Sequence, residues 1–222
     1  MIVVDVETTG LIPGKSGVVA IGAIEFEHPQ NQFYAECRIG KTTLVDPFAL
    51  EVNGFTPDQI YDPTKPTQAA AVRSFLAWAD KVTDRTMGGH NTIFDIRMLR
   101  AVCRSAKIKT SLLYGSIDLH NLIYARLLQM RQPIPLNHYG WFSAKADDVH
   151  QFVGLPAEPQ PHRALTGAKM EAEAMSRLLH GQLLLAEFSK YAIPDYLLIR
   201  NGSVSTPKSP RRRPGLRTKR SE

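Results

Sequence analysis

The chain has 222 residues, of which 43% are hydrophobic and 22% charged, which is enough for one well-buried α/β domain with a tail. No apolar stretch approaches the length of a membrane span, and Met1 runs directly into an apolar strand, so we expect neither a membrane anchor nor a leader peptide. Cys37 and Cys103 match no metal-binding spacing, and we interpret both as reduced packing residues of a cytoplasmic protein.

The net charge of +6 belongs to the C-terminal segment. Residues 201–222 hold seven of the 27 basic residues and one of the 21 acids, so the rest of the chain is neutral. The segment is also rich in Ser, Pro and Gly, which predicts disorder. We interpret it as an arm that binds nucleic-acid phosphates, and a solubilising terminus without a fixed role is the alternative. The predicted organisation is therefore a folded domain over residues 1–200 and a disordered basic tail over 201–222.

Three strands are predicted at the start of the chain, at Ile2–Val6, Val18–Phe26 and Gln32–Ile39. The connections between them are short, which suggests an antiparallel meander. The Pro- and Gly-containing stretch that follows is predicted to be a loop. The apolar spacing after it predicts an amphipathic helix over Thr67–Val82.

The remainder of the domain is predicted to alternate strands with helices. The strands are Arg85–Gly89 and Gly115–Leu119. The helices are Ile93–Lys107, a segment ending at Met130, Ala144–Val153, and Arg163 to about Leu185. Three strands followed by this alternation predict an α/β domain with a mixed five-stranded sheet and flanking helices.

Two acids stand two positions apart in the first predicted strand. Because side chains alternate along a strand, Asp5 and Glu7 project from the same face. Like charges on a core element repel each other unless a cation or a proton joins them, and Mg²⁺ prefers oxygen ligands of this kind. The pair favours a divalent metal site; a strand end where both acids are hydrated is the alternative.

Two further segments carry groups suited to the same chemistry. Asp95 lies near a helix start that follows a core strand, where its charge would also suit the helix dipole. His162 lies just before the last long helix, and an imidazole can take a proton near neutral pH. A surface histidine in a Pro-rich loop is the alternative for His162.

Together these segments resemble the DEDDh 3′–5′ exonucleases, the RNase T and DNA-polymerase-III-ε-like members of the ribonuclease H-like superfamily. The first family motif matches at positions 5–10 (DVETTG), the second at 90–95 (HNTIFD) and the third in part at 162–165 (HRAL). Segments 49–56 and 117–119 are also similar to the family. The resemblance covers about residues 1–185 and implies a ribonuclease H-like fold for the exonuclease-like domain.

The resemblance implies a phosphodiesterase that uses two Mg²⁺ or Mn²⁺ ions and releases nucleoside monophosphates from a single-stranded 3′ end. Asp5, Glu7 and Asp95 would hold the ions, and His162 would take a proton from the attacking water. The substrate-binding residues would be Thr8, Thr9, Gly10, Asn91 and Phe94, with core packing as the alternative for Phe94. DNA and RNA stay equally open, as do a homodimer and a separate polymerase partner.

The chain departs from the family pattern at one position. The family places an aspartate five residues after the histidine, and here that residue is Gly167. Glu171, one turn further along the predicted helix, could replace it, and a solvated acid at the edge of the apolar stripe is the alternative. Without a replacement, the domain would be a catalytically impaired module that binds nucleic-acid ends.

We expect activity to survive this change, because the other motif residues are present, including His162. A third class of function also stays open. In that class the fold is a docking scaffold, and the basic tail binds RNA, DNA or an acidic partner.

Overall fold

Strand β1 (Ile2–Thr8) lies at the centre of the sheet, because apolar residues at most of its positions allow both faces to be buried. In the computed structural model, which describes residues 1–110 and 114–198, β1 pairs antiparallel with β2 (Val18–Glu25) and parallel with β4 (Met87–Gly89). Strands β3 (Gln32–Glu36) and β5 (Ser116–Asp118) complete the order β3-β2-β1-β4-β5. The predicted mixed five-stranded sheet and its antiparallel meander are confirmed.

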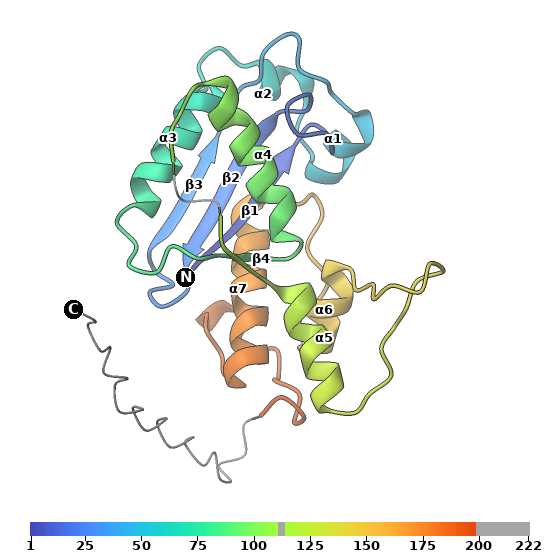
Figure 1. The fold of residues 1–222 in the computed structure, drawn as a ribbon. Helices are drawn as coiled ribbons and strands as arrows, with labels where there is room; N and C mark the ends of the chain where they lie inside the picture. Colours follow the sequence, from blue (N-terminus) through green and yellow to red (C-terminus); the bar gives the residue numbers. More distant parts are fainter. Residues whose placement is uncertain (111–113, 199–222) are drawn as a thin grey trace, which may run out of the picture.

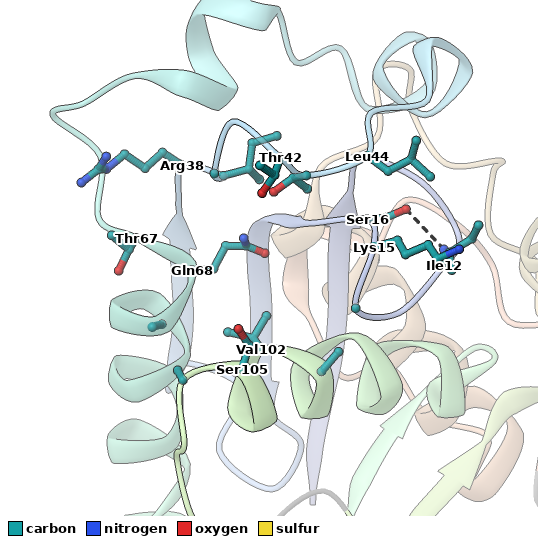
Figure 2. Close-up of a pocket in the computed structure, with 17 residues that line it drawn as sticks. Ile12, Lys15, Ser16, Arg38, Thr42, Leu44, Thr67, Gln68, Val102 and Ser105 are labelled. Carbon is teal, nitrogen blue, oxygen red and sulfur yellow. Dashed lines mark hydrogen bonds between the residues drawn. The ribbon is translucent and has the colours of Figure 1, made fainter.

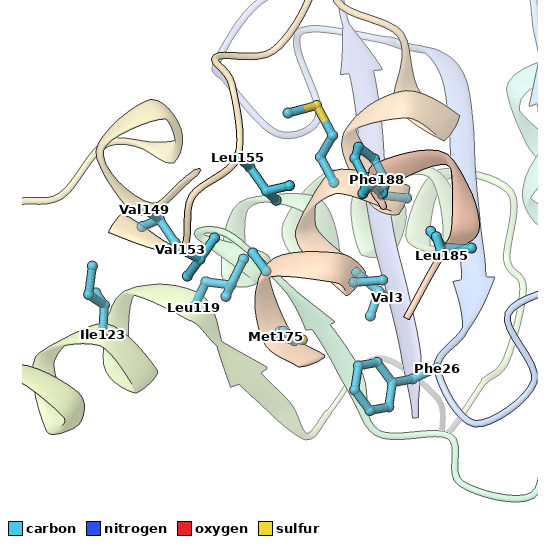
Figure 3. Close-up of a cluster of buried hydrophobic side chains, with 14 of the residues drawn as sticks. Val3, Phe26, Leu119, Ile123, Val149, Val153, Leu155, Met175, Leu185 and Phe188 are labelled. Carbon is cyan, nitrogen blue, oxygen red and sulfur yellow. The ribbon is translucent and has the colours of Figure 1, made fainter. Parts of the chain in front are cut away.

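Helices cover both faces of this sheet (Figure 1). Val4 and its alternate neighbours on β1 pack with α3 (Gln68–Ala79) and α4 (Thr92–Ser105). Val3, which points the other way, packs with the second group of helices, and Figure 3 shows this cluster. That group contains α5 (Leu119–Gln129), α6 (Ala146–Phe152) and α7 (Ala164–His180).

Two short helices lie where the sequence predicts a loop, α1 (Pro47–Asn53) and α2 (Pro57–Tyr61). Each begins with a proline that directly follows a capping residue, Asp46 for α1 and Thr56 for α2. Proline suits the first helical position because no intrahelical partner awaits its missing N–H there. The loop prediction was therefore wrong, since these prolines start helices.

The last long helix also ends earlier than predicted, at His180. Gly181 adopts a left-handed φ of 62°, and its N–H donates to the carbonyl of Arg177, which closes the helix. The chain then continues through a short 3₁₀ helix, Ala186–Phe188.

A close approach places the start of α7 against the sheet. A Cβ on Gly22 of β2 would lie 2.2 Å from the backbone carbon of Ala164. Any other residue would therefore push α7 away from β2. This contact brings the first turn of α7, including Gly167, over the C-terminal half of β1.

Three other predictions concern the rest of the chain. Within the described ranges, none of the helices is both long enough and apolar enough to cross a membrane. Cys37 and Cys103 are buried and free, which agrees with the packing role expected of them. The predicted basic tail over 201–222, and the end of the predicted domain at residue 200, lie outside the described residues.

Candidate active site

Asp5 and Glu7 lie on the face of β1 that α7 covers, opposite Val4 and Val6. Asp5 Oδ2 lies 2.2 Å from the point that a Cβ on Gly167 would occupy. Glu7 is 8% exposed and Asp5 is partly buried, so the alternative of a hydrated strand end is wrong. The spacing of the two acids therefore places both carboxylates beneath the first turn of α7.

Asp95 brings a third acid to the same strand from the first turn of α4. It is 4% exposed, and its Oδ1 accepts a hydrogen bond of 3.1 Å from the backbone N–H of Val6. This bond joins α4 to β1 directly beside Asp5. Two segments that are far apart in the sequence are thereby held together by one of the predicted ligands.

Asp118 fixes the start of the helix that carries Asp95. Asn91 precedes α4 with a left-handed φ of 55° and makes no capping bond with its own side chain. The Asp118 carboxylate instead accepts the N–H groups of Asn91 (3.1 Å) and Thr92 (2.8 Å), and also that of His120 in α5 (2.9 Å). One side chain therefore satisfies free amides at the starts of two helices.

His162 lies beside the acids with its side chain 33% exposed. Its Nδ1 is 3.5 Å from Oε2 of Glu158, and its backbone N–H donates to the carbonyl of Val52 at 3.0 Å. The charge of a protonated His162 would favour the ionised form of Asp5, so the imidazole and the acids belong to one site. The other ring nitrogen, Nε2, is the one that Glu158 leaves available.

Glu158 is a site residue that sequence reasoning missed. Its side chain is 10% exposed, and its Oε1 is buried without a hydrogen-bond partner in the part of the chain that the structure describes. It belongs to no family motif and lies in a Pro-rich segment, so no spacing pointed to it.

Glu171 is buried at 7% exposure, and its Oε2 also lacks a partner among residues 1–110 and 114–198. It lies one helical turn after Gly167 and points toward β4, 3.1 Å from where a Cβ on Gly89 would be. The alternative that Glu171 is a solvated acid is therefore wrong.

The acids raise one another's pKa because they are buried together. Burial, followed by the charge of Glu158, raises the pKa of Asp5 to about 7. Burial and the charge of Asp5 raise the pKa of Glu7 to about 8, and burial raises that of Glu158 to about 7. The pKa values of Asp95 and Glu171 also lie well above the ordinary range, chiefly through burial and then through Asp5.

A divalent cation of the Mg²⁺ type needs several oxygen ligands around one point. Among the described residues, no group of three or more His, Cys, Asp or Glu side chains is arranged to hold a metal ion as it stands. The unpartnered oxygens of Glu158 and Glu171 nevertheless fit a hard cation, because a buried carboxylate oxygen without a donor favours a positive partner.

The turn after β1 holds three of the predicted substrate-binding residues. Thr9 is fully buried, and its hydroxyl donates to the carbonyl of Leu44 at 2.6 Å, while the Thr8 hydroxyl donates to the carbonyl of Gly10 at 2.9 Å. A Cβ on Gly10 would lie 2.8 Å from Ser16 Oγ. These contacts stabilise the turn, and the contact of Thr8, Thr9 and Gly10 with a substrate stays a prediction.

The two other predicted substrate-binding residues lie at the start of α4. Asn91 is exposed, whereas Phe94 is partly buried and packs against the core between the sheet and α3, as its alternative interpretation expected. Leu11, directly after the first motif, is 77% exposed and is therefore no core residue.

Two cavities lie apart from the acids. One of about 720 Å³ is bordered by the N-terminus of α3, the C-terminal part of α4 and the loops around Lys15 and Arg38 (Figure 2). The other, of about 700 Å³, is mostly apolar and lies between α5 and α6. No acid of the cluster lines either cavity, so the cluster is a separate feature.

Comparison with known proteins identifies relatives in sequence and in fold. The Escherichia coli protein named 3′-5′ DNA exonuclease Cap18 is 25% identical over 175 residues, which are 77% of this chain and 86% of Cap18. The cell-death related nuclease 4 (CRN-4) has a similar fold, with a TM-score of 0.63, 14% identity, and coverage of 80% of this chain and 62% of that one.

E. coli Exonuclease I is a further structural relative. Its complex with a dA16 oligonucleotide matches with a TM-score of 0.59, 19% identity, and coverage of 80% of this chain and 40% of that one. A zinc-bound form of an Exonuclease I complex with single-stranded DNA matches similarly, with a TM-score of 0.58, 18% identity and coverage of 80% and 39%. The chain thus spans less than two thirds of CRN-4 and of Exonuclease I.

The RNase T family model, described as an exonuclease, matches residues 2–175 and so includes the first two motifs and His162. Because that match covers most of the chain, the protein belongs to the RNase T exonuclease family, the DEDDh type of 3′–5′ exonuclease that its motifs predict.

Proposed function

We propose that this protein removes nucleotides one at a time from the 3′ end of single-stranded DNA by metal-dependent hydrolysis, releasing nucleoside monophosphates. The observation that carries the proposal is the meeting of Asp5, Glu7, Asp95 and His162 at one end of β1. The name of Cap18 and the oligonucleotides in the Exonuclease I complexes support single-stranded DNA as the substrate to test first.

Each side chain has a distinct role in this proposal. Asp5, Glu7 and Asp95 would hold two Mg²⁺ or Mn²⁺ ions, with Glu171 available on the β4 side of the site. The ions would supply Lewis-acid stabilisation of the negative charge that develops on the phosphodiester. His162 would take the proton of the attacking water at Nε2, because Nδ1 faces Glu158.

The catalytically impaired module is not favoured by the geometry. Gly167 removes one acid, but Glu158 and Glu171 are buried around the same site and each carries an unpartnered oxygen. The carboxylate count is therefore not reduced by the loss at position 167. A domain that only binds strand ends has no chemical need for an imidazole beside such a cluster.

Two features outside the catalytic cluster complete the proposal. The free, buried Cys37 and Cys103 support a reducing, cytoplasmic location. The basic segment over 201–222 would add a salt-dependent contact with the nucleic-acid backbone. A homodimer and a separate polymerase partner stay predictions that a measurement of mass in solution would test.

A degradation assay tests the proposed activity. Purified protein with Mg²⁺ or Mn²⁺ should shorten a 5′-labelled DNA strand one nucleotide at a time, and a matched RNA strand tests the sugar preference. Asp5→Asn should slow the reaction by about 100-fold or more, because the loss of several kcal/mol of transition-state stabilisation lowers the rate exponentially. Asp195 is an exposed acid, so Asp195→Asn is the control and should leave the rate unchanged. Tight binding of the strand without shortening, whatever the metal, would contradict the proposal.

A further inference from the structure

We propose that Glu158 supplies the fourth carboxylate of the metal site, in the space that Gly167 leaves open. This inference rests on the proposed metal-dependent function and adds to it a ligand outside every family motif. It is argued from the volume at Gly167, from the burial of Glu158, and from the contacts that hold Glu158 in place.

The volume at Gly167 is shared by two carboxylates. A Cβ there would lie 2.2 Å from Asp5 Oδ2 and 3.4 Å from Glu158 Oε1. The first distance is a clash and the second is a tight van der Waals contact, so a side chain at 167 would displace Asp5 and touch Glu158. The absence of a side chain on α7 and the presence of an acid from the preceding segment are therefore complementary.

Glu158 is largely buried, and one of its carboxylate oxygens has the capacity to bind a cation. The side chain is 10% exposed, and within residues 1–110 and 114–198 its Oε1 makes no hydrogen bond. Buried carboxylate oxygens are normally paired with a donor or a cation. The other oxygen, Oε2, faces His162 Nδ1 at 3.5 Å, so Oε1 is the oxygen directed toward Asp5.

The position of Glu158 is held by contacts on both sides. Its backbone N–H donates to Oδ1 of Asp147 in α6 at 3.2 Å. Four residues later, the backbone N–H of His162 donates to the carbonyl of Val52 in α1 at 3.0 Å. The segment that carries Glu158 is thus attached to two helices before it enters α7, which keeps the carboxylate over the site.

Glu171 is the other acid that could replace the missing aspartate. Its unpartnered oxygen lies 3.1 Å from the Cβ position of Gly89, on the side of β4. Glu158 Oε1 instead lies 3.4 Å from the Cβ position of Gly167, and its Oε2 lies 3.5 Å from His162 Nδ1. The location of Glu158 therefore matches the missing carboxylate more closely than that of Glu171.

Binding of Mn²⁺ provides a test that does not depend on activity. We would titrate the full-length protein with Mn²⁺, following bound ion by electron paramagnetic resonance and by calorimetry. Glu158→Gln keeps the shape of the side chain and should weaken Mn²⁺ binding by at least about 10-fold. Glu171→Gln should weaken it less, and Asp195→Asn should leave it unchanged.

The outcomes separate this inference from the proposed function. Mn²⁺ affinity in Glu158→Gln equal to that of the wild type, with only the pH profile of strand degradation altered, would mean that Glu158 merely orients His162 and would overturn the inference. A wild-type protein that binds Mn²⁺ but shortens no strand would contradict the proposed function. The Mn²⁺ affinity of Glu158→Gln would still show whether Glu158 is a metal ligand. Circular dichroism checks that each variant is folded, and Glu158→Asp offers a second variant with a withdrawn carboxylate.

Discussion

Replacement of Asp5 by Asn should stabilise the metal-free protein above neutral pH, although it removes activity. Burial and the charge of Glu158 raise the pKa of Asp5 to about 7, against 3.8 for an ordinary aspartate such as that of the unfolded chain. Between these two values the folded protein binds a proton that the unfolded chain does not. The stability contributed by Asp5 is therefore fully present below pH 3.8 and is lost as the pH rises toward 7.

The size of the effect follows from this interval. Between the two pKa values, each pH unit changes the free energy of unfolding by about 1.4 kcal/mol per proton. The titration of Asp5 alone should therefore lower the free energy of unfolding of the wild type by about 3 kcal/mol between pH 5 and pH 8. Asn has nearly the same shape and no proton to lose, so this loss should disappear in the variant. Removal of the Asp5 charge also relieves Glu7, which acts in the same direction.

Urea unfolding in EDTA at pH 5 and pH 8 measures this difference. The variant should lose about 3 kcal/mol less stability than the wild type between the two pH values, whereas the exposed-site control Asp195→Asn should follow the wild type. Added Mn²⁺ should stabilise the wild type at pH 8 and have little effect on the Asp5 variant. Equal pH dependence in wild type and Asp5→Asn would refute the reasoning, because it would mean that Asp5 titrates as a solvated acid.

Three further predictions test other parts of the molecule. Arg177 pairs with the fully buried Glu173 at 2.7 Å, so Arg177→Met leaves a buried carboxylate without its cation and should lower the free energy of unfolding in urea by about 3–5 kcal/mol. A change under 1 kcal/mol would contradict this role. Asp118→Ala should cost about 2 kcal/mol of thermal or urea stability, because one carboxylate caps both α4 and α5, and equal stability would show that water replaces it. Deletion of residues 201–222 should reduce the slope of log affinity for a DNA strand against log salt concentration by up to about 5, because the segment has seven basic residues and each neutralised phosphate contributes about 0.7 to the slope. An unchanged slope would exclude the tail as a phosphate-binding arm.

The amino-acid sequence was sufficient for the sheet and for the family. Strands and helices have periods of two and 3.6 residues, so the apolar positions of β1, β2 and α4 reveal their buried faces locally. The same local rule placed Asp5 and Glu7 on one face. It failed at Pro47 and Pro57, because whether a proline ends or starts a helix depends on the capping residue before it and on the space the fold leaves there.

Only the tertiary structure decided which acids lie near Gly167. Nothing in the spacing of the chain connects Glu158 with a missing side chain on the next helix, and only the folded chain places its Oε1 3.4 Å from the Cβ position of Gly167. Asp118 likewise reaches the start of α4 only when β5 lies beside β4, whereas its cap of α5 is local. Periodicity is set by residues that are neighbours in sequence, whereas the space at a site is set by segments that meet after folding.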